Sequence, residues 1–424
     1  MSGERAPVTP ARALSTVPGS IPGRRLAAWL AAIALGVAGF LQAREAAPQR
    51  AWMSVWSNFL FWTSLSIAGV MFGAILQAAK GHWGKPFRRV AEGAAAFLPL
   101  SFLLFLLLYA GADQIFPWLG PAEGAELNRT WLTKDGVFLR DGILLLLLYG
   151  ASFLFLRSSL RVDAPLLVGR HTGWRRRLVS ALGRGWGDDE EEVARCRRRI
   201  GWLSPTLILA WAIVFTVLAF DLSMSLVPGF VSVIWGPYFF VGGWLCLLAL
   251  VGLLSHVYRR RYELDDVWGR WEFHDLGKLT FAFVVFWTYL WFAQFLVIWY
   301  GNLPREAAFF LPRTGNVFSR IYWLQMVLIF GLPFLFLLGR KPKMRSGWLA
   351  FVAVLILTGF WIERYNLVVP SVWQGAGVPL GWPEALISLG FLGLFGLSYS
   401  LFASTFPKIP VRDTIAVGSP QRGP

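Results

Sequence analysis

The sequence is poor in cysteine and in charged residues, and each shortage excludes a class of protein. Its two cysteines, Cys196 and Cys246, have no CxxC or CxxCH spacing, which excludes a disulfide framework, an iron–sulfur site and covalently attached haem in this chain. Only 15% of the 424 residues are charged, against about 25% in soluble domains, while 56% are hydrophobic. The chain is therefore predicted to be a polytopic membrane protein and not a soluble enzyme.

Motifs that would assign chemistry to a loop are also missing. The loops contain no Gly-rich phosphate loop, zinc-ligand spacing or nucleophile motif. The net charge of +16 does not indicate nucleic-acid binding, because long apolar runs separate the basic residues. His256 and His274 could in principle flank a haem, but their places at helix ends would leave the ring half in solvent. We therefore expect no cofactor bound by this chain.

Long apolar runs dominate what is present. About 20 apolar residues are needed to cross a hydrocarbon core of about 30 Å, and ten segments meet this length. They lie near residues 25–42, 52–79, 94–116, 136–157, 201–225, 231–257, 274–300, 317–339, 347–369 and 383–405. The first segment resembles the core of a signal peptide, but its long basic N-terminal tail favours a retained helix. The fold class is predicted to be all-α, a polytopic membrane protein.

The lysines and arginines predict the orientation of these spans. Of the 40 basic residues, 30 lie in the two terminal tails and in alternate loops, six lie in the remaining loops, and four lie inside spans. Basic residues concentrate on the cytoplasmic side of membrane proteins. We therefore expect both termini in the cytoplasm.

Two spans, the fourth and the eighth, carry matching sequences. The fourth begins with Val137–Arg140 (VFLR) and continues to Phe153–Leu156 (FLFL). The eighth begins with Val317–Arg320 (VFSR) and continues to Phe334–Leu337 (FLFL), one residue further along. Matches of this kind at corresponding spans indicate an internal duplication.

The fifth and ninth spans match in their rare charges. Asp221 stands seven residues before Pro228, and Glu363 stands seven residues before Pro370. Four spans return the chain to its starting side, so the duplicated units would have the same orientation, unlike the inverted repeats of many transporters. The predicted parts are a tail (1–24), a flanking helix (25–51), a four-helix bundle (52–229, with a cytoplasmic loop at 158–200), a second bundle (230–371), a flanking helix (372–405) and a tail (406–424).

Charged residues inside the spans are candidate functional residues, because a charge at the bilayer centre costs about 2.5–3.5 kcal/mol on insertion scales. Each predicted bundle has acids and arginines near its outer end, on helices adjacent in sequence. Two interpretations remain open: structural ion pairs within each bundle, or an outer half-channel in which a carboxylate relays protons. The residues concerned are Arg140, Asp141, Asp221, Arg320, Glu363 and Arg364.

A second group of polar residues lies at the predicted cytoplasmic ends of two spans. His256 ends the sixth span, and His274 and Asp275 begin the seventh. Lys278 lies four residues after His274 and therefore on the same helix face. These residues either extend to the lipid–water interface or form the cytoplasmic opening of a proton path.

Two stretches resemble a known family. One is FDLSMSLVP at Phe220–Pro228, followed by Tyr238–Phe240; the other begins HDLGKL at His274–Leu279 and ends IWYGNLPRE at Ile298–Glu306. They are similar to the smaller NrfD-like (polysulfide-reductase-type) membrane subunit of bacterial alternative complex III, a quinol:cytochrome c oxidoreductase. The resemblance extends from the second span to the tenth.

This resemblance implies a ten-helix subunit with two four-helix bundles and no redox cofactor of its own. It implies a larger NrfD-like subunit, a multihaem cytochrome c and an iron–sulfur protein as partners, which would hold the quinol, haem c and clusters. Asp221 matches the Asp of the family's Phe-Asp pair. The family commonly has Asp before the proline and His-Trp after it, whereas this chain has Val227, Gly229 and Phe230. The loss of two ionisable groups favours a scaffold role for the first bundle.

Two further hypotheses are a proton- or ion-coupled transporter and a quinol-binding catalytic subunit.

Overall fold

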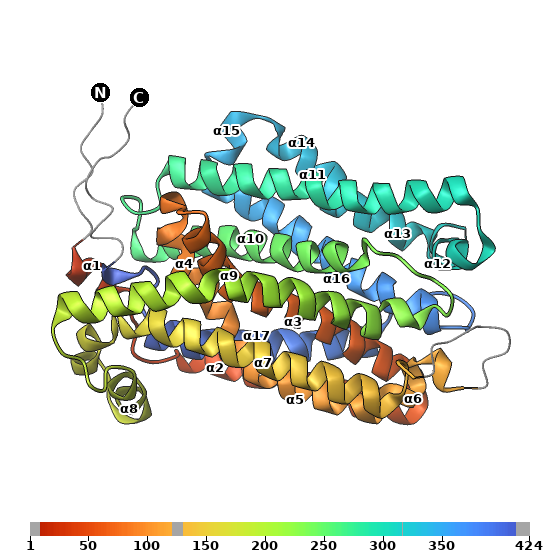
Figure 1. The fold of residues 1–424 in the computed structure, drawn as a ribbon, viewed down its shortest axis with the longest axis horizontal. Coiled ribbons are helices and arrows are strands. Elements are labelled where there is room, and N and C mark those ends of the chain that lie inside the picture. The colour runs from red at the N-terminus through yellow and green to blue at the C-terminus, as the bar shows by residue number, and fades with distance from the viewer. Residues whose placement is uncertain (1–8, 121–129, 316, 413–424) are drawn as a thin grey trace.

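The protein is all-α, as predicted, and no strand occurs in the residues that the structure describes, 9–120, 130–315 and 317–412. Within those ranges this computed structural model has ten helical segments long and apolar enough to cross a membrane, which confirms the predicted count (Figure 1). They are Gly23–Ala46 (α2), Pro48–Ala78 (α3), His82–Ile115 (η1 to α6), Lys134–Arg161 (α7), Asp189–Leu226 (α9 and η7), Trp235–Tyr262 (α10), Arg270–Gly301 (α11), Ser319–Leu338 (α13 to α14), Ser346–Val372 (α16) and Trp382–Thr405 (α17).

Several of these segments are built from shorter pieces. The third comprises η1 (His82–Phe87), α4 (Arg88–Glu92), η2 (Gly93–Phe97), α5 (Leu98–Leu108), η3 (Tyr109–Gly111) and α6 (Ala112–Ile115). The eighth comprises α13 (Ser319–Met326), the π-helical turn η8 (Val327–Gly331) and α14 (Leu332–Leu338), and α9 itself ends at Leu222. Helices outside the long segments include α1 (Pro10–Ser15), α8 (Gly173–Leu182), α12 (Pro304–Thr314) and α15 (Arg340–Lys343).

Two segments begin earlier than the sequence predicts. The third starts at His82 and the fifth at Asp189, each about a dozen residues before the apolar run. In the fifth, the side chain of Asp188 accepts hydrogen bonds from the backbone amides two and three residues later. This N-cap, together with the acidic first turn, stabilises the start of α9 within the charged loop. α9 therefore runs without interruption from this loop into the apolar segment.

Helices α3 and α10 form the centre of the molecule, and nearly all their side chains are buried. α3 packs against α5 and α9, with α7 between those two; α10 packs against α11 and α16, with α13 and α14 between those two. Contacts of α3 with α10 and α16, and of α9 with α10, join the two sets. A duplication would produce this repeated order of contacts. The division into two bundles remains a prediction.

Small residues allow the two sets of helices to approach closely. A Cβ atom added at Gly243 of α10 would lie 2.8 Å from the Cβ of Ser64 on α3, closer than packed atoms can approach. A Cβ at Gly69 would lie 2.4 Å from the carbonyl oxygen of Ala91. In a membrane, where no hydrophobic force drives helices together, such close packing is a main source of association.

The π-helical turn η8 lies between the two motifs whose spacing differs between the repeats. The eighth span has one more residue between its VFSR and FLFL motifs than the fourth span has between VFLR and FLFL. A π-helical turn accommodates one extra residue within an α-helix. An added residue changes the angular position of the residues on one side by up to about 100° relative to those on the other. The matching helices of the two predicted units, α7 in the first and α13 to α14 in the second, therefore present different side chains to the interior.

The flanking helices α2 and α17 pack against each other along a glycine-lined contact. A Cβ added at Gly36 would lie 2.3 Å from the Cα of Gly390, and a Cβ at Gly393 would lie 3.0 Å from the Cβ of Ala32. The opposite face of α2 leaves apolar side chains such as Leu30 exposed. The contact with α17 therefore holds α2 to the rest of the protein.

Replacing Gly390 by leucine is expected to detach α2, because the side chain would overlap the backbone of α2 at this crossing. Limited trypsin digestion at Arg44 and Arg50, which lie at the α2–α3 junction, should become several-fold faster. The control is Gly150→Leu on α7, since a Cβ at that glycine has no atom within 4 Å. Equal digestion of both variants would contradict this account of the contact.

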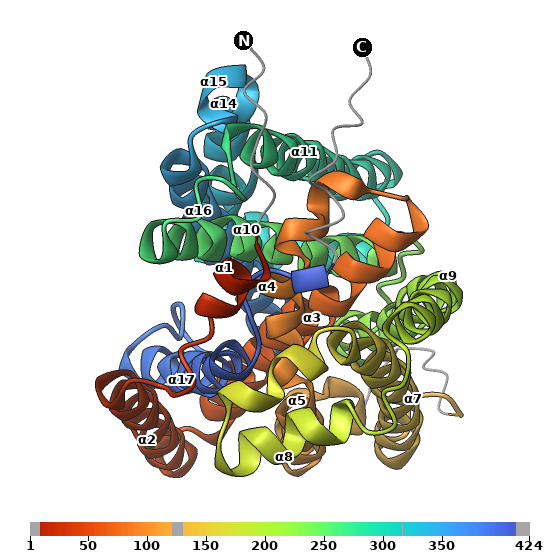
Figure 2. The ribbon, with the colours of Figure 1, turned by 90° about the vertical axis from the view of Figure 1, so that its left-hand side faces the viewer.

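A cap of short segments covers the end of the molecule at which both termini lie (Figure 2). α1, α8 and residues 406–411 contribute buried apolar side chains such as Leu14, Val179 and Val411 to one cluster. The backbone amides of Val411 and Arg412 donate to the carboxylate of Asp163 at 3.3 Å. We call this end of the molecule the termini end, and it is the end that the sequence predicts to be cytoplasmic.

Lys408 makes the docking of this C-terminal segment dependent on pH. Its ammonium group donates hydrogen bonds to the carbonyls of Ala403 and Phe406, and neither partner is an acid. Burial lowers the pKa of this group from 10.5 to about 7, and repulsion from Arg261 and Arg25 adds to the shift. The unfolded segment holds this proton more tightly, so docking should strengthen as pH rises from about 7 towards 10.5. Amide exchange of residues 406–411, corrected for intrinsic rates, should slow between pH 7 and 9. Lys408→Met should remove this dependence, and its persistence in the variant would refute the explanation.

Candidate functional site

The first cluster of membrane charges is an ion pair at the far end, the end opposite the termini. Arg140 of α7 donates to Oδ2 of Asp221 on α9 through Nη2 at 2.5 Å and Nε at 3.0 Å. The indole N–H of Trp131 donates to Oδ1 of the same carboxylate at 3.0 Å, and its ring lies 3.9 Å from the guanidinium. Asp221 is 1% exposed. The pair therefore joins α7 to α9.

Asp141 lies beside this pair without a donor of its own. It is fully buried, and neither carboxylate oxygen has a hydrogen-bond partner among the described residues. Its charged neighbours are Asp221 and Arg140. Two carboxyl groups thus share one guanidinium. One guanidinium compensates one carboxylate, so the second carboxyl group is compensated only while it holds a proton.

The second cluster centres on Glu363 and Arg364, neighbours on α16 that are both buried. Arg364 donates through Nη1 to Oε2 of Glu363 at 2.9 Å and through Nη2 to the carbonyl oxygen of Phe239 on α10 at 2.9 Å. Its guanidinium also lies 3.9 Å from the centre of the Phe239 ring. This arginine therefore compensates the buried glutamate and joins α16 to α10.

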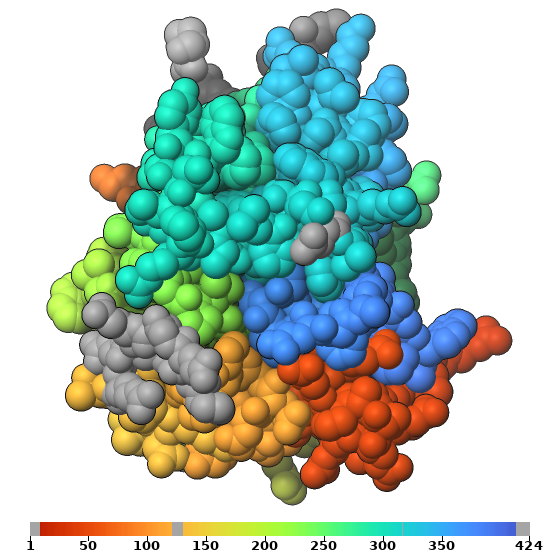
Figure 3. Space-filling model, turned by 90° about the vertical axis from the view of Figure 1, so that its right-hand side faces the viewer, coloured from red at the N-terminus to blue at the C-terminus, as the bar shows by residue number. Residues whose placement is uncertain are grey.

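Arg313 of α12 is a buried cation that completes the second cluster. Pro370 has no backbone N–H, so the carbonyl of Asn366 loses its usual helical partner. Nε of Arg313 donates to this carbonyl at 2.8 Å, and Nη2 donates to Ser371 Oγ at 2.6 Å. α12 covers the far end of the second set of helices, as the outer face in Figure 3 shows. The arginine therefore holds this cover on the kinked end of α16.

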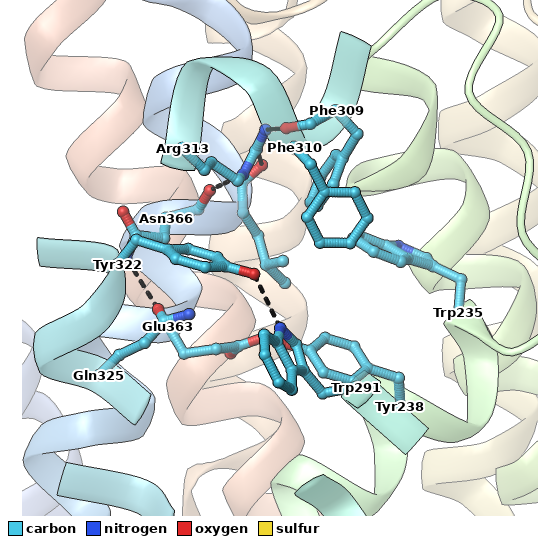
Figure 4. Close-up of a pocket in the computed structure, with 11 residues that line it drawn as sticks. Trp235, Tyr238, Trp291, Phe309, Phe310, Arg313, Tyr322, Gln325, Glu363 and Asn366 are labelled. Atoms are coloured by element: carbon cyan, nitrogen blue, oxygen red, sulfur yellow. Dashed lines mark hydrogen bonds between the residues drawn. The ribbon is translucent and has the colours of Figure 1, made fainter. Parts of the chain in front are cut away.

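A small cavity lies between these groups (Figure 4). Glu363, Arg313, Tyr238 and Tyr322 line it together with Gln325 and several aromatic rings. The volume open to the centre of a water-sized sphere is about 10 Å³, which is room for about one water molecule. A quinol ring does not fit a space of this size. The cavity is suited to a single water beside a carboxylate.

In the second set of helices, α13 does not bring an arginine to Glu363, whereas in the first set α7 brings Arg140 to Asp221. Arg320, which matches Arg140 in sequence, is exposed, and the buried residues of α13 are Tyr322, Gln325 and Met326. The extra residue at η8 separates this helix from the register of α7. Arg364 and Arg313 supply the positive charges instead. An ion pair between Arg320 and Glu363 on neighbouring helices is therefore not formed.

The termini end holds the other predicted residues on separate helices. Nδ1 of His256 on α10 lies 2.9 Å from Oγ of Ser346, the first residue of α16. On α11, Lys278 Nζ lies 3.0 Å from Asp275 Oδ1, and His274 Nδ1 lies 3.8 Å from the same oxygen. The Lys278 side chain is 56% exposed. His256, His274 and Asp275 are half-buried, so Lys278 is the exposed member of this group.

A buried ionic network at the termini end was not predicted. Arg89 donates to Asp163 Oδ2 and to Glu92 Oε2, each at 2.6 Å, and Ser159 donates to the other oxygen of Glu92 at 2.5 Å. Arg89, Glu92 and Asp163 are at most 2% exposed. Arg88 contacts Glu92 at 3.2 Å. The four-residue spacing of Arg88 and Glu92 was the only sequence signal.

Comparison with known proteins finds a partial similarity to a hydrogenase subunit and does not define a family. No family model matches it. Over 119 residues it is 26% identical to the probable Ni/Fe-hydrogenase 2 b-type cytochrome subunit of Escherichia coli (strain K12). The match covers 28% of this chain and 30% of the relative, less than a third of that protein's length.

Proposed function

We propose that the chain is an integral membrane subunit of a quinol-oxidising respiratory complex, of the kind formed by the smaller NrfD-like subunit of alternative complex III. Its role is to support assembly and to carry protons through the far half of the membrane. Three observations support this proposal: the two family-like stretches, the ten apolar helices and the partial similarity to a probable b-type cytochrome subunit of a Ni/Fe-hydrogenase. The buried carboxyl groups, Asp141 with Asp221 and Glu363 with its water-sized cavity, carry the proton part of the proposal.

The relative's name refers to a b-type cytochrome, so the fit of a haem to this chain can be considered. Haem iron is most often held by His, Cys or Met. Neither the cavity beside Glu363 nor the apolar cavity between α3, α9, α10 and α11 has any of these residues in its lining. His256, whose Nδ1 contacts Ser346, could still bind iron through Nε2, but it lines neither cavity. The two cavities therefore do not fit a haem. In the proposal, haem c and the iron–sulfur clusters belong to partner subunits.

The quinol is likewise assigned to a partner, the larger NrfD-like subunit. A quinol-oxidising site needs space for the ring and a base for its protons. The cavity beside Glu363 has the base but room for only one water. The apolar cavity between α3, α9, α10 and α11 has space but no ionisable side chain in its lining. Because the base and the space lie in different cavities, the chain suits the proton role better than the quinol-binding catalytic role.

The far half of each bundle provides the groups that a proton relay needs. In the first bundle, two carboxyl groups share Arg140, so the pair can hold one proton without an uncompensated charge. In the second, Oε1 of Glu363 has no hydrogen-bond partner within the described residues and adjoins the cavity. Carboxylates with nearby water are the usual relay groups in membranes.

Deleting this chain from cells tests the proposal. Membranes of cells that lack this chain should lose quinol-dependent reduction of cytochrome c, and expression of the unaltered chain should restore it. Under the transporter alternative, quinol oxidation would persist without the chain. In that case, a solute gradient driven by protons should depend on Asp221 and Glu363 in liposomes that contain the chain alone.

A further inference from the structure

An apolar groove with a volume of about 350 Å³ lies between α3, α9, α10 and α11. Figure 1 shows α10 behind the space that separates α9 from α11. The groove extends from Ala79 and Gly81, just beyond the end of α3, to Phe240 in the first turns of α10. Phe286 at its edge is 43% exposed. The groove is thus a recess in the surface that would face lipid.

The walls of the groove are rigid and offer almost no hydrogen bond. Aromatic contacts fix them: the Phe72 and Trp244 rings stack with centroids 6.0 Å apart, and the Trp211 and Phe240 rings lie 5.1 Å apart. The lining contains no carboxylate, amide, hydroxyl or cationic side chain. The polar side-chain atoms of the lining are the indole N–H groups of its three tryptophans, and those of Trp211 and Trp244 have no partner in the described residues. These groups are donors only, so the hydroxyl protons of a quinol would have no side-chain acceptor there, at a cost in free energy. A hydrocarbon chain has no such protons to pair.

The mouth of the groove at the termini end is basic. Lys80 lies between the two lining residues Ala79 and Gly81 and is exposed. A Cβ added at Gly201 of α9 would lie 3.9 Å from Gln77 of α3, which brings the basic residues 197–199 of α9 beside this mouth. No acidic residue occurs in residues 77–91 or 193–205. The local charge is therefore complementary to an anionic headgroup.

We propose that this groove binds one acyl chain of an anionic phospholipid, with the lipid phosphate at Lys80 and the basic turn of α9. The apolar walls accept the chain and the basic mouth selects the headgroup. This site is separate from the carboxyl clusters at the far end and does not depend on the proposed respiratory role. A transmembrane helix of another protein is the competing occupant.

Native mass spectrometry of the full chain with added phosphatidylglycerol or phosphatidylcholine tests the site. One phosphatidylglycerol should be retained, at least about tenfold more tightly than phosphatidylcholine, since each basic residue near the surface contributes to anionic-lipid binding. Ala79→Trp should fill the mouth and lower retention of both lipids. Lys80→Glu with Arg198→Glu, which changes one charge on each side of the mouth, should remove the preference for phosphatidylglycerol.

Two matched variants control for bulk and for charge elsewhere. Leu146→Trp adds an indole at an exposed position of α7, and Lys341→Glu with Arg345→Glu makes the same charge change away from the groove. Equal retention of the two lipids, or equal losses in the control variants, would overturn the proposal. So would a photo-crosslinker at Ala79 that captures another polypeptide, and no lipid, in native membranes.

Discussion

Replacing Arg364 by methionine is expected to destabilise the protein by about 3–5 kcal/mol, because Glu363 would remain as an uncompensated buried charge. Arg364 is 1% exposed, and it also donates to the carbonyl of Phe239, so two buried acceptors lose their donor. The apparent unfolding temperature in detergent and the yield of monodisperse protein measure this effect. The second change Glu363→Gln should restore much of the loss, since it removes the charge.

Arg320→Met is the matched control for this prediction. Both arginines lie near the same end of the second bundle, but the side chain of Arg320 is exposed and pairs with no acid in the described structure. Its replacement should change stability by less than about 0.5 kcal/mol, as for most surface substitutions. If Arg320→Met were as damaging as Arg364→Met, the assignment of Arg364 as the partner of Glu363 would be wrong.

Replacing Asp221 by asparagine and Glu363 by glutamine is expected to slow proton transfer through the far half of the membrane by about 100-fold, the lower range for a lost acid–base group. An amide has nearly the same shape as the carboxyl group but cannot take up and release the proton. The measurement is proton release per electron by the assembled complex in liposomes during quinol oxidation. Assembly should be preserved in Asp221→Asn, because Arg140 is partly exposed and can be solvated. Glu363→Gln leaves Arg364 buried without its anionic partner, so proton release by that variant is compared at equal amounts of assembled complex.

Asp141→Asn distinguishes a relay from a structural pair. Asp141 makes no hydrogen bond within the described residues, so its replacement removes a proton site without breaking an ion pair. It should therefore reduce proton release while the unfolding temperature stays within a few degrees of the original. Unchanged proton stoichiometry in all three variants would leave these residues as structural groups only.

The sequence predicts the helices well, because length and hydropathy determine them directly. The ten segments follow from local patterns. Arg140 and Asp221 were among the candidate members of ion pairs near the outer end, and the structure joins them. The starts of the third and fifth segments were missed, since helices there continue beyond the apolar run. Their polar turns are stabilised by an N-cap at Asp188 and by the buried network around Arg89.

The second cluster could not be predicted from the sequence, because tertiary packing decides it. Arg313 looked like a loop residue, yet α12 folds over the bundle and buries it against the carbonyl that Pro370 leaves without a partner. The sequence named Arg320, Glu363 and Arg364 as candidates without assigning a partner to Glu363. The one-residue difference in spacing was visible in the sequence, but its location at η8 and its effect on which residues face inward required the structure.

Purification of the tagged full chain from native membranes in mild detergent tests the central proposal most directly. The account predicts that a second, larger NrfD-like membrane protein, a multihaem cytochrome c and an iron–sulfur protein copurify in fixed ratio, that the preparation oxidises quinol, and that the visible absorption belongs to the partners. A stable, colourless protein isolated alone, from membranes whose quinol:cytochrome c activity is recovered intact in other fractions, would contradict it.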